Sequence, residues 1–328
     1  MEKIEVRLLD VDLNQFSEDW HKAAAVPKYI KRISTGLQKA YTYQDFNYVA
    51  PLRGIHTDHL SVFRGLKAIE INPTELCNRT CHFCPRVDPD VYPNRNLHMT
   101  IETMQALVED LVQHKYVGQI TFSGMGEPLL NRDILKLIET ASKAGIYTEM
   151  VTNGDKILQS KWYQLQDFVD AGLSCMFVDI YDSKEQYDTW IDLIKPFSGK
   201  IRFRITPRFI TTTDNFNNRT GMIKHDLIDT NAFKAPCFAP AVKAFIDWDG
   251  TVQLCCHDWS RTGGNFGNIN EQPFHQIWNN DKMNKIRYNL MNKNRTECGA
   301  PCNECSTGGN QKDKFIKKTW DKALTFTN

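Results

Sequence analysis

The sequence lacks a long apolar run, an excess of charge of either sign and an apolar leader at its start. Its 328 residues include 40 Lys and Arg against 39 Asp and Glu, a net charge of +1. A chain this close to neutral has no overall electrostatic attraction to nucleic acid or anionic membranes. No segment approaches the roughly 20 apolar residues of a membrane-spanning helix, and the charged residues 1–7 are unlike a secretory signal. We therefore expect a cytoplasmic protein with no membrane or nucleic-acid partner.

Disulfides are not expected either, although the chain has ten cysteines. Cytoplasmic thiols stay reduced, so cysteines that cluster in such a chain are better interpreted as metal ligands or nucleophiles. The remaining composition, 41% hydrophobic and 24% charged, is typical of a globular protein with a sizeable core. The length predicts about two domains.

Strand-like apolar segments alternate with amphipathic helices over much of the chain. The pattern begins with a strand at residues 66–72 and a helix at residues 101–114, and it continues to a strand at residues 200–205. Alternation at this spacing predicts βα units around a parallel sheet, whose functional edge lies at the carboxyl ends of the strands. A full eight-unit barrel typically takes about 250 residues, so we expect an α/β fold with a partial (β/α)6 TIM-like barrel.

The pattern changes after residue 208, where a polar loop rich in Asn and Thr leads into sequence rich in Cys, Gly and Trp. We divide the chain into three parts on this basis. Residues 1–65 form an N-terminal extension of unknown role, residues 66–225 form the barrel core, and residues 226–328 form a small C-terminal domain.

The first group of cysteines is a C-x3-C-x2-C run, formed by Cys77, Cys81 and Cys84 shortly after the first strand of the barrel. Three thiolates on one loop can hold three corners of a 4Fe-4S cluster and leave the fourth iron without a protein ligand. The alternative is a structural zinc knuckle completed by His82. Against it, His82 is fixed beside Cys81 in the loop, and the spacing differs from the paired C-x2-C units of a zinc ribbon.

With the aromatic residue Phe83 just before its last cysteine, this run resembles the signature of the radical S-adenosylmethionine (SAM) enzymes. The resemblance implies that the open iron is chelated by the amine and carboxylate of SAM. An electron from a donor such as flavodoxin or ferredoxin would then cleave SAM to methionine and a 5′-deoxyadenosyl radical, which abstracts a hydrogen atom from substrate. The cofactor supplies this chemistry, while the protein tunes the cluster and shields the radical.

The residues after the second predicted strand, Gly124, Met125, Gly126 and Glu127, are followed by a proline. They resemble the Gly-Gly-Glu-Pro motif that holds the SAM amino group in this family, with Met125 in place of the first glycine. Backbone carbonyls can still accept the ammonium hydrogens, and Glu127 would be the charged partner. An ordinary strand-to-helix turn would explain the same glycines and proline.

Three further positions are implied as SAM contacts by the same resemblance. Asn153 ends the third predicted strand and Asp179 ends the fourth, at the heights where the family binds the ribose hydroxyls and the carboxylate. Arg204 lies on the next predicted strand, where it could pair with the carboxylate.

A second group of cysteines lies in the C-terminal part, where Cys237 and Cys255 are followed much later by the C-x2-C pair Cys302 and Cys305. An Asp-Gly turn at Gly250 between apolar strands predicts a hairpin that leads into Cys255. Four thiolates from separated segments would close a second 4Fe-4S cluster, and they suit tetrahedral zinc equally well.

The interval C-x12-G-x4-C from Cys237 through Gly250 to Cys255 resembles the SPASM/twitch extension of some radical SAM enzymes. No cysteine follows Cys305, so the resemblance implies one auxiliary cluster and two 4Fe-4S clusters in all. Cys256 could deliver a hydrogen atom to a substrate radical, although neighbouring residues on a strand point to opposite faces. Cys298 is either an alternative ligand or a loop thiol.

The substrate is a small molecule or a peptide. Enzymes with one such auxiliary cluster include sugar and aminocyclitol dehydrogenases, epimerases and peptide maturases. We expect oxidation or epimerisation of a sugar or aminocyclitol carbinol carbon, because residues 1–65 do not resemble a compact leader-peptide-binding domain. The alternatives are a maturase of ribosomally made peptides and, outside enzymes, a zinc-stabilised binding module. Against an RNA-binding module, the sequence has no block of Lys and Arg with interleaved aromatic residues that would form a nucleic-acid-binding face.

Overall fold

A computed structural model describes most of the chain from residue 58 onward. The described residues are 43–44, 58–81, 83–159, 162–210, 217–223, 235–307 and 314–323. His82 and nearly all of the predicted N-terminal extension lie outside them. In the described part, no helix combines the length and the apolar character that crossing a bilayer requires.

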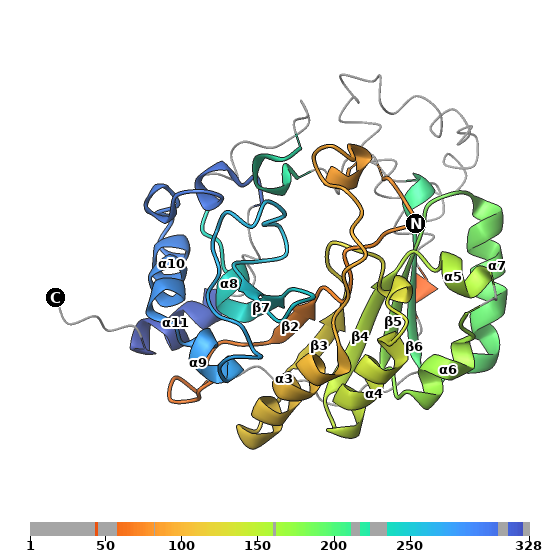
Figure 1. The fold of residues 1–328 in the computed structure, drawn as a ribbon, viewed down its shortest axis with the longest axis horizontal. Helices are drawn as coiled ribbons and strands as arrows, with labels where there is room; N and C mark the ends of the chain where they lie inside the picture. Colours follow the sequence, from red (N-terminus) through yellow and green to blue (C-terminus); the bar gives the residue numbers. More distant parts are fainter. Residues whose placement is uncertain are drawn as a thin grey trace, which may run out of the picture.

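One eight-stranded sheet organises the described residues, in the strand order β1-β6-β5-β4-β3-β2-β7-β8 (Figure 1). Its six central strands are parallel, and β1 (Tyr43–Gln44) and β8 (Val252–Gln253) are antiparallel at the edges. The parallel strands are β2 (Ala68–Ile71), β3 (Gln119–Phe122), β4 (Tyr147–Thr152), β5 (Cys175–Ile180), β6 (Arg202–Pro207) and β7 (Lys243–Ile246). The predicted six-unit α/β barrel is confirmed.

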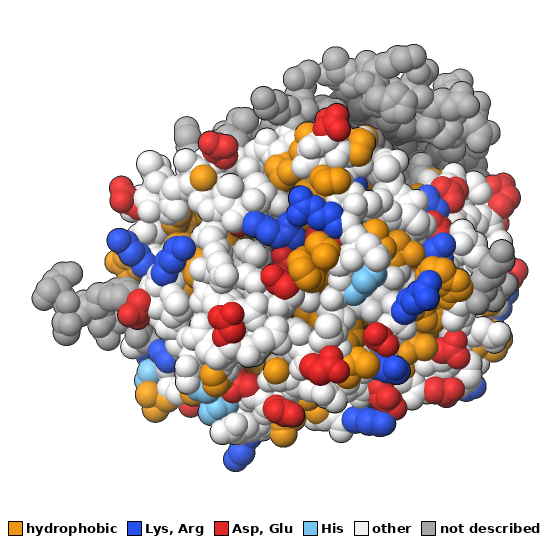
Figure 2. All heavy atoms as spheres, in the orientation of Figure 1, with side chains coloured by type: hydrophobic (Ala, Val, Ile, Leu, Met, Phe, Trp, Pro, Cys, Tyr) orange, Lys and Arg blue, Asp and Glu red, His pale blue; other side chains and the backbone are white. Residues whose placement is uncertain are grey.

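Helices follow the strands and cover the outside of the curved sheet (Figure 1). Those of the core are α3 (Ile101–Gln113), α4 (Ile134–Lys143), α5 (Asp155–Leu158), α6 (Leu165–Asp170) and α7 (Lys184–Ile194). The later ones are α8 (Ala239–Val242), α9 (Phe274–Trp278), α10 (Asp281–Met291) and α11 (Lys314–Ala323). On the face that Figure 2 shows, acidic and basic side chains are interspersed.

Alternation along the strands separates an apolar face from a polar one. On β2, Ile69 and Ile71 are fully buried in the main hydrophobic core, whereas Glu70 between them points to the opposite face of the sheet. The register aligns Glu70 with Thr121 and Thr121 with Glu149 on the neighbouring strands. The concave face of the barrel therefore carries a row of polar side chains that runs across β2, β3 and β4.

The sixth parallel strand comes from the C-terminal part of the chain. β7 pairs with β2 so that Ala68 lies opposite Lys243, and β7 continues through a tight turn at Gly250 into β8. The hairpin predicted at Gly250 is therefore present, and φ is +85° at that glycine, a value that side chains rarely allow. In Figure 1 the C-terminal helices lie on one side of β2 and the strands β3 to β6 on the other.

Candidate active site

A cavity of about 380 Å³ lies at the carboxyl ends of the parallel strands. The loops that follow β2, β3 and β4 line it, together with the ends of β5 and β6 and part of the C-terminal domain. The cavity brings together most of the residues predicted from sequence: Cys77, Cys81, Cys84, Gly124, Met125, Gly126, Glu127, Asn153, Asp179 and Cys256. Arg204 is not part of this lining.

The three thiols of the first cysteine group are half-buried side by side on the loop after β2. Burial, together with negative charge on neighbouring groups, raises the pKa of Cys77 to about 11 and that of Cys81 to about 12. The backbone N–H groups of Arg79 and Arg86 donate to the sulfurs of Cys77 and Cys84. Thiols in this arrangement ionise only beside a strong positive charge, which a metal centre provides.

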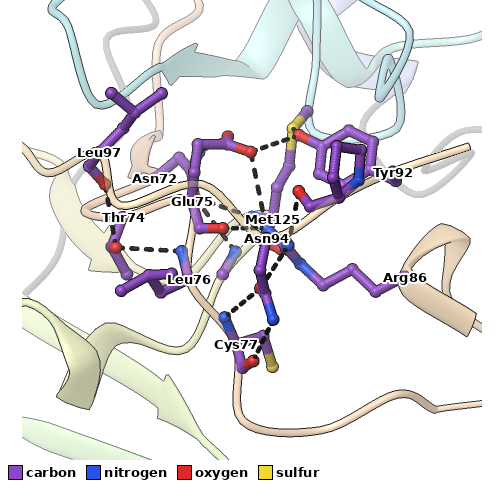
Figure 3. A network of polar contacts seen from close by, with 12 residues as sticks. Asn72, Thr74, Glu75, Leu76, Cys77, Arg86, Tyr92, Asn94, Leu97 and Met125 are labelled. Atoms are coloured by element: carbon purple, nitrogen blue, oxygen red, sulfur yellow. Dashed lines mark hydrogen bonds and ion pairs between the residues drawn. The ribbon is translucent and has the colours of Figure 1, made fainter. Parts of the chain in front are cut away.

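A buried arginine fixes the cysteine loop against the next strand (Figure 3). Arg86 donates to the carbonyl oxygens of Met125 at 2.7 Å and Glu75 at 2.8 Å, and to Asn94 Oδ1 at 2.8 Å. The backbone N–H of Met125 donates in turn to Asn72 Oδ1 at 2.9 Å. The carbonyl of Met125, one of the acceptors predicted for the SAM amino group, therefore already accepts one hydrogen bond and has one lone pair left.

Glu127 is buried at the cavity wall, and all its hydrogen-bond donors are neutral. Its Oε1 accepts from the hydroxyl of Thr152 at 2.5 Å and from the backbone N–H of Leu129 at 3.1 Å, and its Oε2 accepts from the N–H of Asn153 at 2.8 Å. Burial raises its pKa to about 7. The carboxylate is thus positioned rigidly, and a bound ammonium would stabilise its ionised form.

Salt bridges hold the middle of the cysteine loop against the ends of β4 and β5. Arg79 lies 2.6 Å from an oxygen of Asp155 and 2.7 Å from one of Asp182. Beside it, Asn153 Nδ2 donates to Asn78 Oδ1 at 3.0 Å. Asn153 was predicted from the sequence and Arg79 was not, although a charged residue inside the C-x3-C spacing was a signal that its side chain reaches a partner.

Asp179 lies at the end of β5 and forms an ion pair with Arg208, at 3.1 Å between Oδ2 and Nη2. Burial raises the pKa of Asp179, and the Arg208 guanidinium opposes this shift. Arg208 lines the cavity, whereas Arg204 is exposed and lies over the Phe177 ring, 5.8 Å from its centroid. Pairing of Arg204 with the SAM carboxylate stays a prediction, and Arg208 is a second cation that could make this contact from the cavity wall.

Another part of the cavity wall carries a charged pair and a thiol. Lys243 Nζ lies 2.9 Å from Glu70 Oε2, and the hydroxyl of Ser123 donates to Glu70 Oε1 at 2.7 Å. The thiol of Cys256 is hydrogen-bonded to the same carboxylate, and burial with the nearby negative charge raises the pKa of Cys256 to about 12. Cys256 therefore carries its hydrogen at neutral pH. Neither Glu70 nor Lys243 was predicted from the sequence.

The second cysteine group is drawn from separated segments in the C-terminal part of the chain: Cys237, Cys255, Cys298, Cys302 and Cys305. Burial raises the pKa of Cys237 and of Cys255, and negative charge on Cys305 adds to both shifts, so these thiols lie close together. Backbone N–H groups of Ala239, His257 and Thr307 donate to Cys237, Cys255 and Cys305, the pattern also found in the first group. Cys298 differs, because its thiol is hydrogen-bonded to Cys302 and lies 3.6 Å from the Asn294 carbonyl.

A buried arginine also fixes the second group. Arg295 donates to the carbonyl oxygens of Ala235 at 2.9 Å, Cys305 at 2.9 Å and Thr307 at 2.7 Å. The guanidinium thus ties the segment before Cys237 to the C-x2-C pair, as Arg86 ties the first loop to the strand beside it. The neighbours Cys255 and Cys256 diverge, one toward this group and the other toward the cavity.

One cysteine group at the carboxyl edge of a six-stranded partial barrel, with a second group in the C-terminal part of the chain, defines a radical SAM enzyme with an auxiliary cluster domain. Residues 71–201 match the family model of the Radical SAM superfamily, and residues 237–306 match that of SPASM, described as an iron-sulfur cluster-binding domain. The chain belongs to the radical SAM superfamily and carries a C-terminal SPASM domain. Its cofactors are SAM and 4Fe-4S clusters, as the resemblance implied.

Two curated relatives illustrate the range of the family. The chain is 25% identical over 251 residues to the S-adenosyl-L-methionine-dependent 2-deoxy-scyllo-inosamine dehydrogenase of Niallia circulans, covering 73% of this chain and 92% of that protein. It is 27% identical over 106 residues to the PqqA peptide cyclase of Bradyrhizobium diazoefficiens, covering 32% and 26%. Among solved structures, BtrN in complex with AdoMet and 2-DOIA has the same fold, with a TM-score of 0.61 at 24% identity over 74% of this chain and 93% of BtrN.

Proposed function

We propose that the enzyme abstracts a hydrogen atom from a carbinol carbon of a sugar or aminocyclitol and oxidises that carbon to a ketone. One observation carries the proposal: the first cysteine group and Cys256 line the same cavity, and Cys256 directly follows Cys255 of the second group. Oxidation needs an acceptor for the electron left on the carbon, and this arrangement puts a second redox site beside the substrate. The dehydrogenase relative, matched over 92% of its length, supports this reaction.

We assign the seven predicted cysteines as cluster ligands. Cys77, Cys81 and Cys84 would hold the first cluster, and Cys237, Cys255, Cys302 and Cys305 the second. The N–H donors on most of these sulfurs suit thiolates within iron-sulfur clusters. When bound, the first cluster with SAM supplies the 5′-deoxyadenosyl radical and the second supplies an electron acceptor, chemistry that no side chain can provide.

The remaining predicted residues would bind SAM. The segment from Gly124 to Gly126 lies close to the cysteine loop and offers backbone carbonyls to the amino group, with Glu127 as its charged partner. Glu127 fits this role because its other partners are all neutral. Asn153 and Asp179 would contact the ribose hydroxyls, and the carboxylate would pair with Arg208 or Arg204.

Glu70 and Lys243 would handle the substrate hydroxyl. Conversion of a carbinol to a ketone removes one hydrogen atom, one electron and one proton. Burial disfavours the ionised form of Glu70, but the charge of Lys243 and the hydrogen bonds around the carboxylate outweigh burial and lower its pKa, so Glu70 is ionised and able to accept a hydrogen bond from the hydroxyl. Glu70 would accept the proton of the hydroxyl, and Lys243 Nζ could then donate a hydrogen bond to the substrate oxygen.

The domain division at residues 65 and 225, the cytoplasmic location and a flavodoxin or ferredoxin electron donor belong to the same proposal. The two family matches, at residues 71–201 and 237–306, support the division. β7 nevertheless pairs directly with β2, so the two domains would act as one unit around the cavity.

Product analysis tests the oxidation. The reconstituted enzyme would be incubated without oxygen with SAM, a reductant and a panel of aminocyclitols and sugar alcohols, and the products analysed by mass spectrometry. Oxidation predicts a product that is two hydrogens lighter than the substrate, with one 5′-deoxyadenosine formed per product. If no member of the panel reacts and a peptide is modified instead, the carbinol proposal is wrong and the peptide alternative is favoured.

Epimerisation is the second candidate, and the protonated thiol of Cys256 in the cavity favours it. The sulfur would give its hydrogen atom to the substrate radical, and the resulting thiyl radical would be reduced by one electron from the external donor and one proton from solvent. The product would be isomeric with the substrate and carry one deuterium after reaction in D2O. Cys256→Ala should then stop epimer formation, whereas oxidation should survive this replacement.

A further inference from the structure

A cluster of metal-binding side chains lies outside the cavity, where the two domains meet. Asp110 lies in the last turn of α3 and His114 is the C-cap residue of that helix, both within the radical SAM match, and His275 belongs to α9, within the SPASM match. One ligand atom from each residue lies within 4.8 Å of the others. α3 and α9 are in contact, as Figure 1 shows, at the end of α3 that faces away from the cavity.

The three side chains lie near the spacing of a small tetrahedral site, and a bound ion would replace the hydrogen bond between His275 and Asp110. Nδ1 of His275 lies 2.7 Å from Asp110 Oδ1, and Nε2 of His114 lies 3.6 Å from the same oxygen. Zinc ligands at about 2.0–2.2 Å are separated by about 3.3 Å in a tetrahedral site, a value between these two distances. The longer distance exceeds a hydrogen bond, so a hydrogen bond does not explain the approach of His114.

The surroundings suit a bound cation. The backbone N–H of His275 donates to Asp110 Oδ2 at 2.8 Å, which orients the carboxylate and leaves Oδ1 toward the imidazoles. The Asp110 side chain is 8% exposed, whereas those of His114 and His275 are 25% and 22% exposed. The carboxylate is therefore held inside, and the imidazoles leave a route for an ion from solvent. The two rings lie 4.2 Å apart between centroids.

The geometry points to a divalent zinc site formed by Asp110, His114 and His275, which fastens the radical SAM domain to the SPASM domain. Two imidazole nitrogens and one carboxylate oxygen form a donor set that binds zinc, with water as the fourth ligand. The ion would be structural, because it lies apart from the cavity residues, and binding to the folded state alone would stabilise that state.

Zinc uptake by the holoenzyme tests the site, with the cysteines occupied by iron. The iron-loaded enzyme would be equilibrated without oxygen against buffered Zn²⁺, and zinc and iron per chain measured by mass spectrometry. We expect about one zinc per chain with iron unchanged. In His114→Gln, affinity should fall at least about tenfold, because loss of even an outer partner of a ligand has that effect. His114→Gln retains the hydrogen bonds between Asp110 and His275.

His59→Gln is the matched control, because His59 is exposed and remote in sequence from the cluster. It should bind zinc as the wild type does. Zinc should also raise the thermal unfolding midpoint of the wild type and of His59→Gln, but not that of His114→Gln. The inference is overturned if the wild type takes up no zinc while its iron is intact, or if His114→Gln binds zinc with wild-type affinity. Neither outcome depends on the substrate of the enzyme.

Discussion

The two cysteine groups differ in how the chain builds them. The first draws Cys77, Cys81 and Cys84 from one short loop and leaves them half-buried on the wall of a cavity. The second gathers thiols from separated segments, with Cys302 and Cys305 buried. A loop that offers three sulfurs to an open cavity suits a site that must admit another molecule. Sulfurs enclosed on several sides suit a site that exchanges only electrons.

The largest expected effect separates the two groups by their chemistry. Cys81→Ala should abolish 5′-deoxyadenosine formation, because two thiolates no longer hold the site at which SAM binds. Cys302→Ala should leave some uncoupled SAM cleavage and stop product formation. Chromatography of 5′-deoxyadenosine and product measures both, with the β5 residue Cys175→Ala as the control. Equal loss of 5′-deoxyadenosine formation in Cys81→Ala and Cys302→Ala would contradict the different roles proposed for the two cysteine groups.

The two buried arginines offer a matched test of how each group is supported. Arg86→Met and Arg295→Met each leave backbone carbonyls without their buried donor, so each should lower the free energy of unfolding by about 3 kcal/mol. We expect about eight irons per chain in the wild type and about four in each variant. Only Arg295→Met should retain a spectroscopic response to SAM. A response in Arg86→Met instead would reverse the assignment.

A smaller effect concerns pH and the proposed SAM site beside the first cysteine group. Burial raises the pKa of Glu127 to about 7, so without SAM the protonated carboxyl stabilises the fold at low pH, and this stabilisation is lost as pH rises through about 7. SAM needs the ionised form, and its affinity should fall about tenfold per pH unit below 7. Calorimetric titration measures this slope.

Glu127→Gln should weaken SAM binding and remove the slope, whereas the exposed Glu185→Gln should change neither. A slope that persists in Glu127→Gln would assign the titration to another group.

The smallest expected effect concerns which cysteines of the second group are cluster ligands. Cys298→Ala should leave the iron content and product formation unchanged, and the free energy of unfolding within about 0.5 kcal/mol of the wild type. The reason is that the sulfur of Cys298 contacts carbonyl oxygens, as the donor of a protonated thiol does. Iron analysis and denaturant unfolding measure this. Loss of four irons in Cys298→Ala, together with full iron in Cys302→Ala, would exchange the roles of the two residues.

Much of the fold, and the first cysteine group, could be predicted from the spacing of residues that are close in the sequence. The helix expected at residues 101–114 is α3, Ile101–Gln113, and the C-x3-C-x2-C run needed no tertiary information. Short-range patterns of this kind depend on residues that are neighbours in both the sequence and the structure.

Features that depend on distant segments were not predictable in this way. The strand expected to end at residue 205 continues to Pro207, so the carboxyl edge of the sheet lies two residues later and Arg208 enters the cavity in place of Arg204. Glu70 and Lys243 meet only because β7 pairs with β2. The apolar run that forms β7 was interpreted only as an arm of a hairpin, since nothing in its own sequence names its parallel partner.

The pairing of β7 with β2 also constrains how the protein can be made. A nascent chain that has emerged only as far as residue 201 presents β2 with one unpaired edge, because its partner at residues 243–246 has not yet left the ribosome. Such an edge invites pairing with other chains, and contacts between segments so far apart slow folding. Synthesis of the C-terminal domain therefore completes the barrel, and a fragment that stops before residue 243 would be prone to aggregate.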